Sequence, residues 1–294
     1  MAIQQIWTGS AQYLCDPELA QAFHMARVLG MPLLIEGEPG TGKTELPIQF
    51  AQSMDLSLFT YPVGSKSTVD QFVAKFDHVK YLRDSQTEIL NAQRTEKGLD
   101  PLSLGGRSTE NLDDYVMLGP GAKSFSHANS VLLIDEIDKA PREFPNDLLF
   151  ALSHRKFFLP ESGKVIETTE SDMPAIVITS NREQELPTAF KGRCIYHYIS
   201  FPEPDMMKQI LAKHYPEANE DLVGRCMELF YQLRKLGLER APSTRELLQW
   251  LSYLQHLDIE AAMEKIDKKE GMGALVKTQA DLKRIMQLKN LPHV

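Results

Sequence analysis

The sequence predicts an α/β fold with a five-stranded parallel sheet and a smaller helical domain after it. Five short apolar runs, each bounded by turn residues, have the character of buried parallel strands and alternate with helical stretches. After Pro202 this strand pattern stops and only helical periodicity continues. We therefore expect an αβα domain over residues 1–203 and a helical domain over residues 204–294. The predicted strands are residues 33–36, 58–62, 131–134, 175–179 and 195–200.

Helix start and stop signals frame this pattern. Asp-Pro at residues 16–17 is typical of an N-cap followed by the first helical position, and Gly30 falls where a helix-ending glycine is expected. In the C-terminal part, Ser243 and Glu246 form a capping-box pattern that predicts a helix running through Leu257. The first helix leads directly into the first predicted strand.

Composition excludes several classes of protein. No apolar run approaches the roughly 18 residues of a membrane span, and the N-terminus lacks the pattern of a secretory signal, so we expect a soluble cytoplasmic protein with no membrane partner. The net charge of −8 disfavours a broad nucleic-acid surface. The cysteines are odd in number and far apart, which indicates neither a disulfide framework nor a thiolate zinc site: Cys15, Cys194 and Cys226.

The segment GEPGTGKT, between the first predicted strand and a helix, matches the phosphate-loop pattern G-x-x-x-x-G-K-[ST]. Its glycines allow backbone N–H groups to turn toward phosphate oxygens, and the following helix directs its N-terminal dipole to the same place. Lysine supplies charge to the β- and γ-phosphates, and the threonine hydroxyl is a ligand for Mg²⁺. We expect the whole loop to bind ATP: Gly37, Glu38, Pro39, Gly40, Thr41, Gly42, Lys43 and Thr44.

The segment VLLIDEID, residues 131–138, supplies a second half for such a site. Four apolar residues predict a buried strand, and Asp135 at its carboxyl end is placed to hold magnesium through water. Glu136 follows directly and is placed to polarise the attacking water as a general base. The alternative is an ordinary strand that ends in acidic residues.

Three further polar residues suit phosphoryl transfer. Asn181 follows the run 175–179, where its amide is able to orient water; a loop-capping asparagine is the alternative. Arg193 precedes the last predicted strand, where an arginine finger would stabilise charge on the transferring phosphoryl group of a neighbouring subunit. Arg245 is the second residue of the capped helix, so its guanidinium and the helix dipole point the same way. A solvated surface arginine is the alternative for both.

Five motifs of the chain resemble those of the AAA+ ATPases in their order and spacing: GEPGTGKT, VLLIDEID, ITSN, FKGRC and APSTREL. One longer segment is particularly similar to the MoxR branch of that family: SFSHANSVLLIDEIDKAPREFPNDLLFAL. The resemblance implies a P-loop NTPase sheet of strand order 5-1-4-3-2 under a helical lid. It implies assembly into a ring of six with nucleotide at the subunit interfaces. It also implies that Asn181 is sensor 1, that Arg193 acts in trans and that Arg245 is a nucleotide-contacting sensor 2.

Two segments match elaborations of that branch. Residues 155–167 predict a hairpin before sensor 1. Residues at about 84–124, which include a glycine-rich stretch over 95–111, occupy the position of a helix-2 insert. The chain also departs from the branch, since it has Gly-Arg-Cys around Arg193 where MoxR proteins usually have Asp-Arg-Phe, and a shorter segment before it.

These observations favour an Mg·ATP hydrolase that remodels or matures a protein client, as the MoxR resemblance implies. That resemblance also implies a client with a von Willebrand A domain. Two alternatives stay open: a nucleic-acid motor or loader, since Gly-Arg-Cys also resembles the arginine-finger motif of clamp loaders, and a switch or scaffold that binds ATP without hydrolysing it. A small-molecule kinase is the least favoured, because it would leave the Asp-Glu pair and Arg245 unused.

Overall fold

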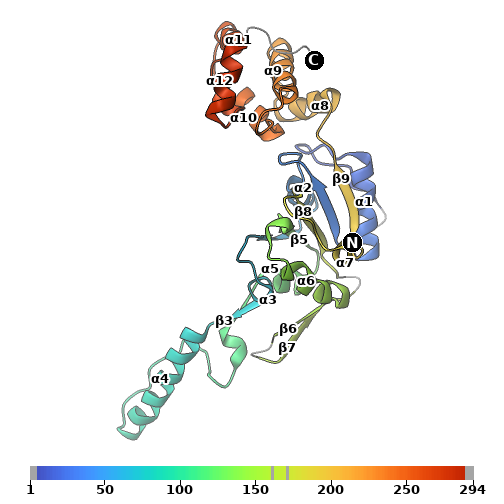
Figure 1. Cartoon of the computed structure of the whole chain (residues 1–294). Helices are drawn as coiled ribbons and strands as arrows, with labels where there is room; N and C mark the ends of the chain where they lie inside the picture. The colour runs from blue at the N-terminus through green and yellow to red at the C-terminus, as the bar shows by residue number, and fades with distance from the viewer. Residues whose placement is uncertain (1–4, 160–161, 170–171, 289–294) are drawn as a thin grey trace. The chain divides into compact units, whose positions relative to one another are not determined.

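The computed structural model describes residues 5–159, 162–169 and 172–288 and contains a central five-stranded sheet (Figure 1). The strand order is β2-β5-β8-β1-β9. When these five strands are renumbered 1 to 5 along the chain and the sheet is read from β9, the order is 5-1-4-3-2. The predicted fold class is therefore confirmed. The strands are β1 (Leu33–Gly37), β2 (Ser57–Pro62), β5 (Ser130–Asp135), β8 (Ala175–Ser180) and β9 (Ile195–Ile199).

The register of the sheet brings the polar ends of neighbouring strands together. β5 pairs in parallel with β2 on one side and with β8 on the other, with Ile134 opposite Ile178. The apolar run of β5 is buried, as its lack of alternation predicts, and only the terminal Asp135 is partly exposed. The residues that follow Ile134 and Ile178 therefore leave the sheet side by side.

The first helix begins and ends at recognisable signals. The Asp16 Oδ1 accepts hydrogen bonds from the N–H groups of Glu18 (2.9 Å) and Leu19 (3.2 Å), and Gly30 has a φ of +60° just after the first helix ends. These contacts confirm the predicted first helix. The helices of this part are α1 (Pro17–Leu29), α2 (Glu45–Ser53), α3 (Val69–Val73), α5 (Pro120–Phe125), α6 (Glu143–His154) and α7 (Thr188–Lys191).

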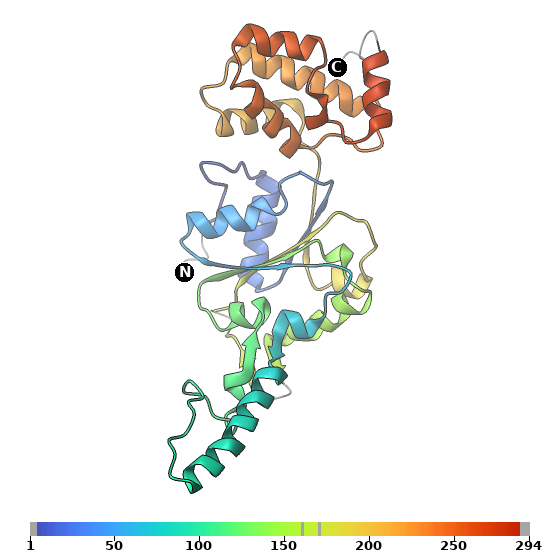
Figure 2. The ribbon, with the colours of Figure 1, turned by 90° about the vertical axis from the view of Figure 1, so that its left-hand side faces the viewer.

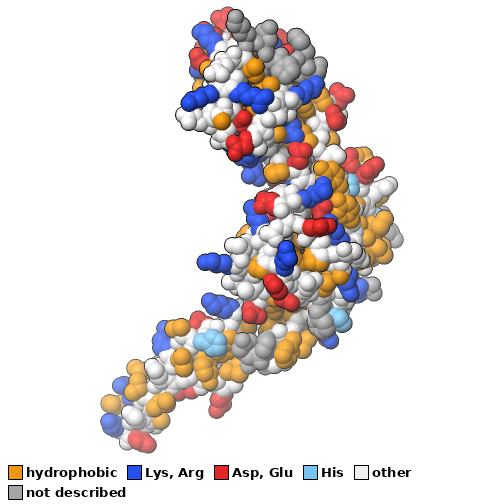
Figure 3. Space-filling model, viewed as in Figure 1, with side chains coloured by type: hydrophobic (Ala, Val, Ile, Leu, Met, Phe, Trp, Pro, Cys, Tyr) orange, Lys and Arg blue, Asp and Glu red, His pale blue; other side chains and the backbone are white. Residues whose placement is uncertain are grey.

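A helical arm extends from a small antiparallel sheet of β3 (Ala74–Phe76) and β4 (Val116–Leu118). Its helix α4 (His78–Glu96) begins before residue 84, the expected start of the insert. The reason is that the Asp77 side chain accepts a hydrogen bond from the Lys80 N–H and caps the helix there. The chain returns beside α4 through residues 97–111 and a 3₁₀ turn (Figure 2). Apolar side chains remain exposed along the arm (Figure 3), among them Val79, Leu82 and Ile89.

A second excursion is the antiparallel pair of β6 (Lys156–Leu159) and β7 (Lys164–Glu167), in the segment where a hairpin was expected. Its buried face carries the cross-strand pair Phe157 and Ile166, and its exposed face carries Phe158 and Val165. Residues 160 and 161 of the expected segment lie outside the described residues.

The C-terminal helices surround a core of their own that includes Phe230 and Trp250. The predicted capping box of Ser243 and Glu246 is present, but its helix ends at Leu254 instead of Leu257, because the chain tightens into i→i+3 hydrogen bonds there. The helices are α8 (Pro204–His214), α9 (Glu220–Lys235), α10 (Thr244–Leu254), α11 (Ile259–Asp267) and α12 (Gln279–Gln287).

The chain divides into two compact units that are not two consecutive halves of the sequence. The first contains residues 21–35 and 50–197, with the arm and the hairpin. The second contains residues 7–20 and 36–49 together with the C-terminal helices from residue 198 onward. None of the helices that the structure describes is both long enough and apolar enough to cross a bilayer.

Candidate functional site

The phosphate-loop segment, residues 37–44, is part of the second unit and connects β1 to α2. Lys43 is buried, and its Nζ donates hydrogen bonds to the carbonyl oxygens of Gly37 (2.9 Å) and Glu38 (2.8 Å). The Thr41 hydroxyl donates to the same Glu38 carbonyl at 2.9 Å. The loop therefore curves around the lysine ammonium group, which is the charge that a phosphate loop offers to its ligand.

Two glycines of this loop lie where no side chain fits. A β-carbon on Gly37 would be 2.5 Å from the carbonyl oxygen of Ile199. Gly40 has a φ of +79°, and a β-carbon there would be 2.4 Å from the β-carbon of Ser243. The motif requires glycine at position 37 but not at position 40, so the need for Gly40 comes from the packing of the loop against the start of α10 and could not be read from the motif.

Arg245, the candidate sensor 2, belongs to the same unit and is the second residue of α10. Its side chain is exposed. The start of this helix is fixed by Glu246, whose carboxylate accepts hydrogen bonds from the N–H (2.7 Å) and the hydroxyl (2.9 Å) of Ser243. Because Ser243 also packs against Gly40, the helix end that carries Arg245 is held against the phosphate loop.

The first unit brings Asp135, Glu136 and Asn181 together at the ends of β5 and β8. The buried Thr179 hydroxyl donates to Asp135 Oδ1 at 2.6 Å and accepts from the Glu136 N–H at 2.9 Å. The Asn181 amide donates to Glu136 Oε1 at 3.1 Å. Glu136 has a left-handed backbone (φ 59°), an uncommon conformation that turns its side chain at the strand end.

Two further residues complete this acidic cluster. Asp138 is 1% exposed, and its Oδ2 accepts from the backbone N–H groups of Asn181 (3.1 Å) and Glu183 (2.8 Å), which positions the loop after β8. Lys139 Nζ donates to Glu136 Oε2 at 2.6 Å, and this hydrogen bond raises the pKa of Lys139. Thr179, Asp138 and Lys139 are not among the predicted site residues, although all three lie within the segments ITSN and VLLIDEIDK.

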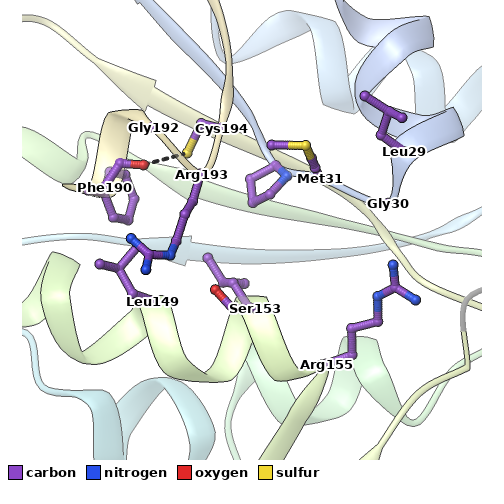
Figure 4. A pocket seen from close by; sticks show the side chains of 12 residues that line it. Leu29, Gly30, Met31, Leu149, Ser153, Arg155, Phe190, Gly192, Arg193 and Cys194 are labelled. Atoms are coloured by element: carbon purple, nitrogen blue, oxygen red, sulfur yellow. Dashed lines mark hydrogen bonds between the residues drawn. The ribbon is translucent and has the colours of Figure 1, made fainter. Parts of the chain in front are cut away.

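Arg193 lies elsewhere in the first unit, between α7 and β9, and is exposed. It borders an open depression of about 220 Å³ (Figure 4). Its Nη1 donates to the Ala189 carbonyl at 3.0 Å, while Arg155 borders the same depression. Burial raises the pKa of the neighbouring Cys194 to about 12, so this thiol stays protonated at neutral pH. The depression thus presents guanidinium groups beside apolar walls.

The donor atoms available to a metal are oxygens. Among the described residues, no group of three or more His, Cys, Asp or Glu side chains is arranged to hold a metal ion. The Thr44 hydroxyl and the Asp135 carboxylate are the hard oxygen ligands that Mg²⁺ prefers, and Mg²⁺ commonly keeps several waters and takes its remaining ligands from phosphate groups. Each of these oxygens, by its own chemistry, suits magnesium that arrives with a nucleotide.

Comparisons with known proteins identify the family. The family of the AAA domain (dynein-related subfamily) matches residues 32–194, which is more than half of the chain. Among solved structures, a RuvB mutant from Thermotoga maritima has 14% sequence identity and a TM-score of 0.51, and the match covers 92% of this chain and 75% of that one. At this identity the likeness concerns the fold. The search of curated proteins found no match. Because its family match and fold agree, the chain belongs to the dynein-related subfamily of AAA domains, within the AAA+ ATPases.

Proposed function

We propose that this protein hydrolyses Mg·ATP and uses the energy to remodel a protein client. The observation that carries the proposal is the acidic cluster, in which Thr179 links Asp135 to the Glu136 backbone and Asn181 contacts the Glu136 carboxylate. A carboxylate held beside a neutral amide is the arrangement that orients water for attack on a phosphoryl group. This arrangement favours a hydrolase over a protein that only binds ATP.

In this proposal the phosphate loop binds the triphosphate through its backbone N–H groups, and Lys43 contributes charge to the β- and γ-phosphates. Thr44 and, through water, Asp135 would hold a magnesium ion, which would neutralise phosphate charge. Glu136 takes the proton of the attacking water, and Asn181 orients that water. Arg245 contacts the nucleotide from α10.

Arg193 has a separate role in the proposal. It acts on the nucleotide of a neighbouring subunit in a ring, most simply a hexamer, where it stabilises the charge of the transferring phosphoryl group. Its exposure at the rim of the depression supports this role, because a residue that acts in trans has to be accessible to a partner copy.

We assign the chain, as a finer proposal, to the MoxR-type branch, working in the cytoplasm on a client with a von Willebrand A domain. The support is the β6–β7 hairpin ahead of sensor 1 and the helical arm between β3 and β4. Both are exposed excursions from the sheet with apolar side chains on their surfaces, which suits contact with another polypeptide.

The test compares two substitutions in steady-state ATPase assays and in calorimetric ATP binding. Lys43→Ala is expected to lose about 100-fold in ATP affinity, because the buried ammonium group, which donates to two carbonyl oxygens of the loop, is the charge that the loop offers to the phosphates. Glu136→Gln is expected to bind ATP and to release almost no phosphate. Thermal unfolding checks that both variants fold, and the mass of the ATP-bound Glu136→Gln protein reports the ring. Unchanged turnover in either variant contradicts the proposal.

A further inference from the structure

Arg234, near the end of α9, joins the phosphate loop to the C-terminal helices of the same unit. Its Nη2 lies 2.7 Å from the Glu38 carboxylate, and its Nη1 donates to the Pro242 carbonyl at 2.6 Å. The guanidinium also lies over the Phe201 ring, 3.3 Å from its centroid. The Arg234 side chain is only 15% exposed, whereas that of Glu38 is 50% exposed.

The surrounding contacts fix the guanidinium in this position. Phe201 stacks on Phe230, with ring centroids 6.0 Å apart, and the Tyr231 hydroxyl donates to the Pro202 carbonyl at 2.7 Å. A planar guanidinium that lies on an aromatic face and donates a hydrogen bond to the Pro242 carbonyl loses little entropy on meeting a carboxylate. Arg234 is therefore a pre-positioned cation, and Glu38 is the carboxylate that it meets.

Glu38 has an unusual position for an acidic residue. It lies within the loop proposed to surround a triphosphate, and its own carbonyl oxygen accepts from Lys43 Nζ and from the Thr41 hydroxyl. A carboxylate at this position would repel an anionic ligand if it had no counter-charge. Because guanidinium groups stay protonated in proteins, the pair of Glu38 and Arg234 carries no net charge.

We propose that Arg234 neutralises Glu38 and thereby sets the affinity of the phosphate loop for a triphosphate. This inference rests on the proposed function, since it assumes that the loop binds ATP. It makes Arg234 a positioning and charge-compensating residue, distinct from Arg245, whose proposed role is direct contact with the nucleotide. It also explains why an acidic side chain is tolerated in a phosphate loop.

The experiment measures ATP dissociation constants by calorimetry at low ionic strength for the wild type, Arg234→Gln, Glu38→Gln and the double variant. Arg234→Gln leaves an unpaired negative charge in the loop and is expected to weaken binding about five- to tenfold. Glu38→Gln leaves an extra positive charge and is expected to bind ATP more tightly than the wild type. The double variant is expected to return to within about twofold of the wild type, and raising the salt should shrink all of these differences.

Two controls separate charge compensation from general damage. Arg225→Gln removes another arginine of α9, one that pairs with Glu228 and Asp267 on the surface, and is expected to leave the ATP affinity unchanged. Arg234→Lys keeps the charge and is expected to bind within a few-fold of the wild type, so the test does not depend on the folding of Arg234→Gln.

The outcomes distinguish this inference from the proposed function. If the double variant binds as weakly as Arg234→Gln, or if Glu38→Gln alone weakens binding, charge compensation is wrong and Arg234 has only a structural role. If the wild type binds no ATP, or if Lys43→Ala binds it normally, the failure belongs to the proposed function instead.

Discussion

The phosphate loop and the acidic cluster are held in place by different forces. In the loop, the backbone approaches other parts of its unit so closely that Gly37 and Gly40 have no space for a β-carbon. In the acidic cluster, the buried Thr179 hydroxyl connects Asp135 and Glu136 across two strands by directed hydrogen bonds. The first region is specified by steric exclusion and the second by hydrogen-bond geometry, so they should respond to different substitutions.

The largest loss of stability and ATP affinity is expected when a methyl group is added to the phosphate loop. Gly40→Ala places a β-carbon against Ser243 at a φ of +79°, which combines backbone strain with a steric clash. We expect a loss of about 2–4 kcal/mol in the free energy of unfolding and, because the loop has to shift, a fall of roughly 100-fold in ATP affinity. Chemical denaturation and calorimetry measure the two quantities.

The matched control is Gly98→Ala in the arm. Gly98 has a similar φ of +68°, but a β-carbon there would meet no atom within 4 Å. It is expected to cost only the backbone strain of about 1 kcal/mol. Equal effects of the two substitutions would show that the packing of Gly40 on Ser243 does not constrain the loop.

A smaller and more selective effect is expected in the acidic cluster. Thr179→Val keeps the shape of the side chain and removes the hydrogen bonds to Asp135 and Glu136. We expect hydrolysis to slow by about 10- to 100-fold with ATP affinity nearly unchanged, and stability to fall by about 1 kcal/mol because the part-buried Glu136 N–H loses its partner. Thr60→Val, at an exposed position of β2, serves as the control. A parallel loss of ATP binding would contradict the separation of the two regions.

The arm provides a third polar cluster that has no proposed catalytic role. The buried Asp84 accepts from Arg107 Nε at 2.7 Å and from the Tyr115 hydroxyl at 3.2 Å. Asp84→Asn is expected to speed proteolysis within residues 97–111 about tenfold and to leave ATP turnover unchanged. Asp100→Asn, at an exposed position of the same segment, should change neither. A loss of turnover in Asp84→Asn would mean that the arm contributes to hydrolysis.

The same cluster predicts how the arm responds to acid. The hydrogen bond from Arg107 is the main reason that the pKa of Asp84 is lowered. A carboxyl group whose pKa is lower in the folded state stabilises that state above its unfolded pKa, and this contribution is lost as the pH falls below about 4. Pepsin cleavage of the arm should therefore accelerate below that pH, and it should do so less in Asp84→Asn.

The sequence was sufficient for the fold because the apolar runs and the helical periodicity are local signals. The five strands and the capping box at Ser243 were predicted correctly, and the phosphate-loop and Asp-Glu motifs identified the candidate site. Arg234 could not be identified in this way, since its partner Glu38 is 196 positions away in the chain. Thr179 was missed because its importance depends on the register between β5 and β8. The length of α10 and the start of the arm depend on local hydrogen bonds that periodicity does not encode.

The central claim is that Glu136 activates water for attack on ATP bound by the phosphate loop. Single-turnover hydrolysis of pre-bound ATP by Glu136→Gln, beside the wild type, tests it most directly. The account predicts ATP binding within a few-fold of the wild type and a hydrolysis rate lower by at least about 100-fold, because general-base catalysis contributes factors of this size. A Glu136→Gln protein that hydrolyses bound ATP at the wild-type rate would contradict it.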